Sequence, residues 1–337
     1  MDLPKVRDPF PINAPFKTEI DLYKVGRPLH GQEEDLVFII DENYETIIAE
    51  KLDVIQAFPD HSVCYLTDDL DNLEACLWEL AAKIAQEQPT YTYCDESGFG
   101  SNLLALGLRR DGDIDYRPNE AYFPELAERC FAHLQAQTGL KRLCNMLAVS
   151  IQEDMTLMRN TAGGQHSDQA ECFIVAMPTH WDPAEKMGLN FSQIHDPVAE
   201  NEGLKKSHPS LMSAMINKGP FVRYSWALSS SAALSQNPVL LEGHSLEMPN
   251  LANISEADTL LDALHFRVER QTFLNFPTLN RGLFTLHVYQ QPLRNSLKDQ
   301  ARIDLMADSI ESMSPAARDY RAMTGFADQL VAALRRL

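Results

Sequence analysis

Three segments of the sequence are rich in side chains that could bind a ligand or take part in catalysis. They are MPTHWDPAEKMGLNFSQIHDPV (177–198), FVRYSW (221–226) and RVERQTF (267–273). Near the end of the first segment is a histidine, His195, which follows an apolar turn and precedes Asp196. A histidine imidazole can ligate haem iron and leave the opposite side of the haem open for oxygen.

A haem site would also need apolar walls and cations that meet the propionates. Ile194 and Val198 could contribute to the walls. Arg223 and Arg267 could face the propionates or polarise oxygen. The spacing of these residues does not by itself select a haem site.

Simpler interpretations exist for the same residues. Trp181 and Trp226 could be core aromatics. His195 could be a residue at a helix C-terminus, where the helix dipole favours a cation. The RVER segment could be a solvent-facing strand edge with several salt bridges.

Other motifs give little support for a different cofactor. Gly98, Gly100 and Gly107 lie in ESGFGSNLLALGL, but the third glycine of a dinucleotide fingerprint is replaced by Leu103, so we expect a glycine-bearing turn before a helix. The sequence contains no P-loop, no G-x-S-x-G elbow and no H-E-x-x-H. Such a chain must obtain its reactivity from another kind of cofactor, or only bind ligands.

The chain offers no standard cysteine-based or histidine-based metal motif. None of its six cysteines forms a C-x-x-C pair, which suggests small buried hydrophobic residues in a reducing cytoplasm. His166, Asp168 and Glu171 have a spacing that fits no standard metal site.

The elements that must position these residues change in type along the chain. The first 35 residues or so are rich in proline and should lie extended across the surface. Apolar spacing predicts helices over 43–57, 71–86 and 122–139, so the part up to about residue 145 should be mainly helical.

The next part, about 146–293, is expected to be rich in strands. The strand-like segments are 146–159, 170–178, 220–229, 265–276 and 282–293. In the last segment Phe284, Leu286 and Val288 alternate with polar or aromatic residues, which is typical of a half-buried strand.

Helices are expected again over 255–264, with Ser255 as N-cap, and over 297–310 and 315–336. The sum is an α+β fold with a mostly antiparallel sheet and flanking N- and C-terminal helices.

The length of 337 residues suits one large domain or two small ones, and the net charge of −19 disfavours binding to nucleic acid or to anionic membranes. The same charge is compatible with a cationic small substrate or a basic protein partner. The N-terminus does not look like a signal peptide, and no apolar run approaches the ~18 residues of a membrane span. We therefore expect a cytoplasmic protein.

Six short motifs occur in an order that resembles one known family, the haem-dependent oxidative N-demethylases. They are Gln152-Glu153-Asp154, Pro178-Thr179-His180-Trp181, Lys186-Met187-Gly188, Ile194-His195-Asp196-Pro197-Val198, Arg223-Tyr224-Ser225-Trp226 and Arg267-Val268-Glu269-Arg270-Gln271-Thr272. The openings PFPINAPF and IDENYETIIAEK are also similar, so the resemblance extends over residues 9 to 293.

This resemblance implies a single PAS-like domain, residues 1–337, that binds haem b. It further implies the oxidation of a small secondary amine, such as dimethylamine, to a primary amine and formaldehyde. The reaction would use O2 and electrons from NADPH, and the flavin, the 2Fe–2S centre and the NADPH site would belong to partner reductase subunits. A haem-based gas or redox sensor, a similar enzyme acting on another amine, and a protein without haem remain alternatives.

The resemblance also implies roles for single residues. His195 becomes the iron ligand, Arg223 the polar group beside oxygen, and Glu269 a contact for the cationic amine. Arg267, Trp181, Trp226, Ile194 and Val198 would surround the cofactor. The chain departs from the family pattern at Ser225, where asparagine is expected, at Ala199, where proline is common, and at Phe276-Pro277.

Overall fold

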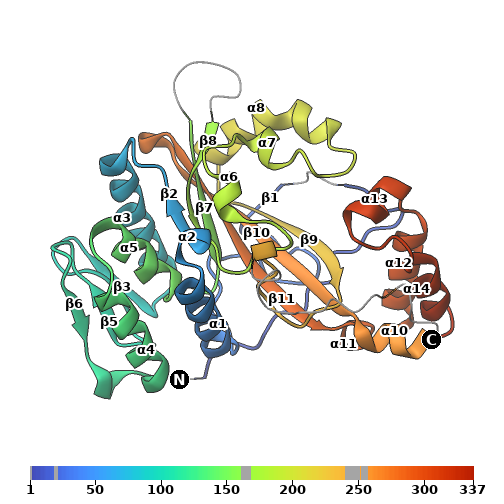
Figure 1. Ribbon diagram of the computed structural model, residues 1–337, viewed down its shortest axis with the longest axis horizontal. Helices are drawn as coiled ribbons and strands as arrows, with labels where there is room; N and C mark the ends of the chain where they lie inside the picture. Colours follow the sequence, from blue (N-terminus) through green and yellow to red (C-terminus); the bar gives the residue numbers. More distant parts are fainter. Residues whose placement is uncertain (1, 19–21, 161–167, 240–250, 252–256) are drawn as a thin grey trace.

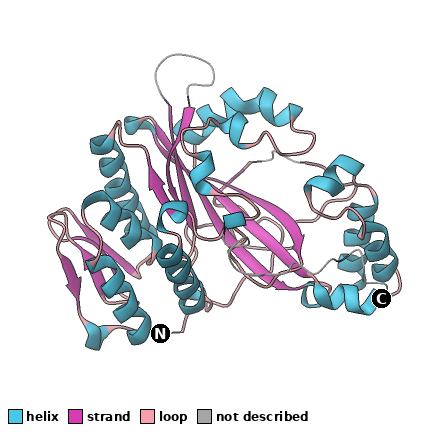
Figure 2. Ribbon diagram, viewed as in Figure 1, coloured by secondary structure: helices cyan, strands magenta, loops and turns pink. Residues whose placement is uncertain are grey.

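The structure is a computed structural model that describes residues 2–18, 22–160, 168–239, 251 and 257–337. A seven-stranded sheet forms its centre, helices pack against both faces, and a four-stranded sheet lies to one side (Figures 1 and 2). Every strand pairing in the two sheets is antiparallel. The predicted α+β class is therefore confirmed.

The large sheet has the strand order β1-β9-β10-β11-β7-β8-β2. Its strands are β1 (Tyr23–Lys24), β2 (Val63–Tyr65), β7 (Asp154–Asn160), β8 (Asp168–Ile174), β9 (Phe221–Ser229), β10 (His265–Phe276) and β11 (Arg281–Pro292). The small sheet contains β3 (Tyr91–Cys94), β4 (Gly98–Ser101), β5 (Leu106–Leu108) and β6 (Ile114–Tyr116).

Helices surround the large sheet in three groups (Figure 1). Near the N-terminus are α1 (Tyr44–Ala57), α2 (Pro59–Ser62), α3 (Leu70–Glu87), α4 (Pro124–Gln135) and α5 (Gly139–Ala148). Between β8 and β9 are α6 (Pro183–Lys186), α7 (Phe191–Ile194) and α8 (Glu202–Asn217). The third group contains α10 (Ala257–Ala263), α11 (Leu293–Ser296), α12 (Gln300–Glu311), α13 (Pro315–Tyr320) and α14 (Ala327–Leu334). The expected Ser255 N-cap lies outside the described residues.

The two faces of the sheet belong to different hydrophobic clusters. On β10, Phe266 and Val268 pack with the apolar residues of α10, α12 and α14. On the other face, Phe273 packs with Met212 and Met215 of α8. Since both faces are covered, side chains that alternate along a central strand are buried on either side.

This covering explains why the expectation of a half-buried β11 is wrong. Phe284, Leu286 and Val288 do alternate with Thr285 and His287, but Thr285 is 0% and His287 is 1% exposed. Thr285 forms a hydrogen bond with Thr272 on β10. Polar residues on this strand therefore face a second buried layer.

His287 lies in that layer between two acidic side chains. Its Nδ1 is 3.1 Å from Glu153 Oε1, and its Nε2 is 3.5 Å from Asp41 Oδ2. Burial alone would lower the pKa of His287, but the two carboxylates outweigh burial and raise the pKa above its ordinary value. The folded protein therefore binds the proton on His287 more tightly than the unfolded chain does.

A His287→Gln variant should lower the free energy of unfolding by about 3–5 kcal/mol at pH 6, because two buried carboxylates lose their cation. The raised pKa makes this contribution complete below the unfolded-state pKa and removes it as pH rises through the folded-state pKa. Urea unfolding at pH 6 and pH 9 measures the difference. Thr285→Val is the control, since threonine does not titrate. If His287→Gln lost the same free energy of unfolding at both pH values, a protonated His287 between Glu153 and Asp41 would be contradicted.

The N-terminal part is not mainly helical, because residues 91–116 form the small sheet. Its strands have only three or four residues, too few to show a period of two in the sequence. Gly98 and Gly100 belong to β4 and Gly107 to β5, so the expected turn before a helix is also wrong. Gly98 has φ +74°, and a Cβ there would lie 2.0 Å from the Leu108 carbonyl oxygen, which explains the glycine.

Helix boundaries also differ from the sequence expectations. The segment 122–139 ends as a helix at Gln135, and α5 begins at Gly139, which has φ +52°. The start of the segment 146–159 is the end of α5 and not a strand. The segment 315–336 is divided between α13 and α14 by a turn with Gly325 at φ +97°. Within the described ranges, no helix combines the length and the apolar character needed to cross a bilayer.

Candidate functional site

A cavity of about 620 Å³ lies between one face of the large sheet and the segment that carries α6, α7 and α8. The sheet contributes alternate residues of four neighbouring strands, namely Arg223 and Ser225, Glu269, Gln271 and Phe273, Phe284 and Leu286, and Thr156 and Met158. The cavity also reaches residues from the N-terminal segment and from α13, including Phe16, Lys17 and Tyr320. Its size is within the range of small-molecule and cofactor sites.

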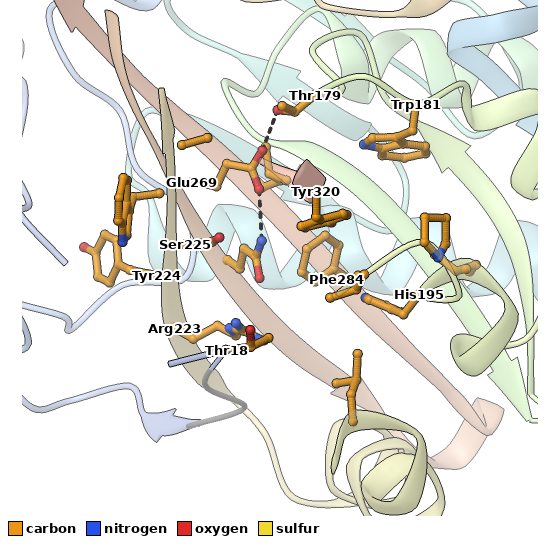
Figure 3. Close-up of a pocket in the computed structure, with 18 of the residues that line it drawn as sticks. Thr18, Thr179, Trp181, His195, Arg223, Tyr224, Ser225, Glu269, Phe284 and Tyr320 are labelled. Atoms are coloured by element: carbon orange, nitrogen blue, oxygen red, sulfur yellow. Dashed lines mark hydrogen bonds between the residues drawn. The ribbon is translucent and has the colours of Figure 1, made fainter. Parts of the chain in front are cut away.

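His195 lies at the C-terminal end of α7, on the side of the pocket across from β9 (Figure 3). Its Nδ1 is 2.7 Å from the carbonyl oxygen of Phe191. Because a carbonyl can only accept, Nδ1 is the donor, and the lone pair of a neutral ring is then on Nε2. Burial lowers the pKa of His195, and the charge of Arg223 lowers it further. At neutral pH the ring is therefore neutral, and its free lone pair is on Nε2.

The lowered pKa argues against the simpler interpretation of His195. A histidine stabilised by the dipole of the preceding helix would be a cation with a raised pKa. The helix in question, α7, also has only four residues. A neutral imidazole with a directed Nδ1–H is the form that metal-ligating histidines take.

Glu269 and Arg223 occupy the sheet side of the pocket (Figure 3). The β9–β10 register pairs Ser225 with Glu269 and Arg223 with Gln271, so these side chains share one face. The Glu269 carboxylate accepts hydrogen bonds from Thr179 Oγ1 at 2.7 Å and from Gln271 Nε2 at 3.0 Å. These donors fix a partly exposed carboxylate beside the cavity.

Arg267 is two residues before Glu269 on β10 and is 0% exposed. Its Nη1 donates to the Leu234 carbonyl at 2.8 Å, and its Nη2 donates to the Met177 carbonyl at 2.8 Å. Its Nε is 3.8 Å from Glu269 Oε1. The terminal nitrogens of Arg267, which were expected to bind a haem propionate, thus donate to backbone carbonyls of this chain. The other cations along the cavity are Lys17, Lys186, Arg223 and Arg321.

The RVER segment is not a solvent-facing strand edge. It forms the middle of β10, between β9 and β11, and Arg267 and Arg270 are both 0% exposed. The Arg270 side chain points to the other face, where its Nε donates to Glu34 at 2.7 Å and its Nη1 to the Val37 carbonyl at 2.9 Å. Arg270 therefore attaches the N-terminal segment to the sheet.

The remaining expected cofactor contacts line the cavity in different ways. Ile194 and Val198 flank His195, and Trp181 packs edge-to-face on Phe173 with ring centroids 5.8 Å apart. Trp226 is 4% exposed and packs with Phe266 on the opposite face from Arg223. It also lines part of the cavity, so it is both a core aromatic and a lining residue.

The sequence did not indicate several residues of the site. Thr179 and Gln271 belong to recognisable motifs, but only the structure shows that both donate to Glu269, Thr179 from the segment between β8 and α6 and Gln271 from the same strand. Tyr320 projects from α13 into the same region, far along the chain from His195 (Figure 3). A loop or helix that returns to a site from the end of the chain leaves no local pattern in the sequence.

The residues present fit a haem. The cavity has apolar walls, it is lined by several cations, and one imidazole nitrogen is available at its wall. A porphyrin would itself supply four nitrogen ligands to the iron, so a single histidine would be sufficient to hold it. The other metal candidate in the sequence was the group His166, Asp168 and Glu171. His166 lies outside the described residues, Glu171 forms an ion pair with Arg281, and Asp168 is 2.7 Å from His208 Nε2.

Comparison with known protein families agrees with this geometry. Residues 29–331 match a family described as haem-dependent oxidative N-demethylase, alpha subunit-like. The match includes all six motifs, the strands that line the cavity and the segment with His195. The chain therefore belongs to the haem-dependent oxidative N-demethylase alpha-subunit-like family.

Proposed function

We propose that this chain is a single PAS-like haem subunit that demethylates a small secondary amine of the dimethylamine type. The amine, O2, and two electrons and a proton from NADPH, together with one further proton, would give the primary amine, formaldehyde, water and NADP⁺. Haem b, when bound, would supply the oxidative chemistry. The observation that carries the proposal is the neutral His195 at the wall of an apolar cavity, with Nδ1 bound to a carbonyl and Nε2 available.

The chain's own residues would divide the remaining work. His195 would hold the iron, and Ile194, Val198 and Trp181 would exclude water. Arg223 would stabilise negative charge that develops near oxygen, since a fixed cation in a dry pocket acts strongly. Glu269 would bind the ammonium form of the amine.

Other subunits would have to deliver the electrons. The alpha-subunit-like family description supports partners of this kind. A partner reductase would carry the flavin, the 2Fe–2S centre and the NADPH site. The cysteines in the described part of the chain are free thiols, which supports a reducing compartment such as the cytoplasm.

Optical spectra of the purified protein test the proposal. The protein as isolated, or after titration with hemin, should show a Soret band that changes on reduction. With a reducing partner, the protein should convert dimethylamine to methylamine and formaldehyde in equal amounts. A haem spectrum without formaldehyde release from dimethylamine would leave a sensor or an enzyme for another amine, and failure to bind hemin would exclude the haem site.

A Glu269→Gln variant should retain haem and raise the KM for the amine about 10- to 100-fold, because a hydrogen bond to a charged group contributes about 1.5–3 kcal/mol. Steady-state formaldehyde release measures this effect. Thr179→Val is the matched variant, since it removes one donor to the carboxylate but keeps its charge, and its effect should be smaller. An unchanged KM in Glu269→Gln would place the amine elsewhere.

A further inference from the structure

A buried carboxylate connects strand β8 with both helices next to His195. Asp168 Oδ2 accepts a hydrogen bond from the backbone N–H of Phe191 at 2.8 Å, at the first residue of α7. Asp168 Oδ1 is 2.7 Å from Nε2 of His208 on α8. Asp168 is 4% and His208 is 0% exposed, so these bonds are shielded from water.

The second nitrogen of His208 is also engaged. Its Nδ1 is 2.7 Å from Ser192 Oγ, on the second residue of α7. Ser192, His208 and Asp168 thus form a continuous hydrogen-bonded relay. The relay has the residue types of a hydrolytic triad, but His208 is fully buried and Ser192 does not line the cavity, so the relay is not part of the ligand pocket.

Phe191 joins this relay to His195. Its carbonyl oxygen accepts from His195 Nδ1 at 2.7 Å, while its own N–H is held by Asp168. Its ring packs against both histidines, with centroids 4.2 Å from His195 and 5.3 Å from His208. Any shift of Phe191 would therefore move the acceptor that orients the His195 ring.

The short length of α7 makes these contacts necessary. A helix of four residues cannot be stable by itself, since nucleation costs more than one turn of hydrogen bonds returns. A capping box between Asn190 and Gln193 closes the first turn. That box sets the local turn but not its position against the sheet, which Asp168 and His208 determine.

We propose that Asp168 and His208 are positioning residues, which hold the Phe191 carbonyl where it orients His195 and leaves Nε2 directed at the haem iron. This inference rests on the proposed function, because it requires that His195 is the ligand. Groups that orient a ligating histidine usually change metal affinity or activity by about 10- to 100-fold when they are removed.

Two conservative variants test the relay, Asp168→Asn and His208→Gln. Each should weaken hemin binding about 10- to 100-fold in a titration and shift the iron–histidine stretching band of the ferrous protein in resonance Raman spectra. In the haem-free protein, ¹⁵N NMR of the His195 ring should show Nδ1 protonated in the wild type and a mixture of tautomers in Asp168→Asn. The ring signal is assigned by its absence in His195→Ala.

A buried histidine far from α7 provides the matched control. His133 on α4 forms a 2.7 Å hydrogen bond with Asn145 and is 8% exposed. His133→Gln should leave hemin affinity, the Raman band and the His195 tautomer unchanged. If it altered them as strongly as Asp168→Asn does, the effect would be general destabilisation and the relay would be refuted.

The outcomes separate the relay from the proposed function. If the wild type binds hemin and His195→Ala does not, but folded Asp168→Asn and His208→Gln keep the wild-type affinity, band and tautomer, only the relay is wrong. If His195→Ala itself keeps the spectrum, the ligand assignment fails first. If circular dichroism shows that a buried variant is unfolded, Ser192→Ala is measured in its place, because Ser192 is partly exposed. Ser192→Ala should shift the iron–histidine stretching band in the same way.

Discussion

A His195→Ala variant is expected to lose most of its haem, with hemin binding at least about 100-fold weaker and the Soret band largely absent. The reason is the loss of the proposed iron ligand itself, which should exceed the 10- to 100-fold effect of removing a group that only orients a ligand. The apolar walls of the cavity would remain. Hemin titration followed by absorbance measures the change.

His180→Ala is the matched control for this experiment, since His180 is a second histidine at the same cavity. It should keep full haem occupancy. A His195→Gly variant should recover a histidine-like spectrum when imidazole is added, because the free base can enter the vacated space. Full occupancy and an unaltered spectrum in His195→Ala would rule out the assignment.

The pKa of His195 adds a dependence on pH. A ligating imidazole must be neutral, so metal binding competes with protonation. Burial and Arg223 lower the pKa of His195. The ring should therefore stay neutral and able to bind iron at pH values somewhat below the ordinary histidine pKa of about 6.5. Hemin affinity should be constant from pH 8 to pH 6.5 and fall only in more acidic buffer. A loss that begins above pH 6.5 would contradict the buried, neutral ring.

An Arg223→Ala variant should keep its haem and lose about 10²- to 10³-fold in turnover. Removal of a single preorganised group that stabilises developing charge has an effect of this size. Arg223 lies on the sheet side of the pocket, across from His195, so its loss should leave the ligand in place. Formaldehyde release with a saturating reducing partner measures turnover, and the optical spectrum confirms haem content.

Two further arginine variants make this result specific. Arg223→Lys keeps the charge but not the planar guanidinium, and it should recover part of the activity. Arg109→Ala removes an exposed arginine that pairs with Asp111 near the small sheet, and it should have no effect. If Arg223→Ala turned over at the wild-type rate, Arg223 would have no part in the reaction.

Local patterns in the sequence were sufficient for several elements of the fold. The buried positions Ile47, Ile48, Leu52 and Ile55 follow helical spacing, and α1 spans Tyr44–Ala57 as expected. Residues 265–276 form β10 over their full length. These segments are long enough for their period to be read, whereas the strands of the small sheet are not.

The candidate site could be predicted only in part. The short motifs around His195, Arg223 and Glu269 pointed to the family and to the strands that carry the site. They could not show that the terminal nitrogens of Arg267 donate hydrogen bonds to the Leu234 and Met177 carbonyls. Such bonds depend on which distant segment covers a strand, and residue spacing contains no information about that.

By itself, then, the sequence determined the α+β class, the main strands and the family, because periodicity and ordered motifs are properties of neighbouring residues. Only the tertiary structure decided that the polar side of β11 is buried and that His195 is neutral with Nε2 available. Only it brought together Asp168, Ser192 and His208. These features arise from packing between elements distant in the chain, where burial and hydrogen-bond partners set the charge and direction of each side chain.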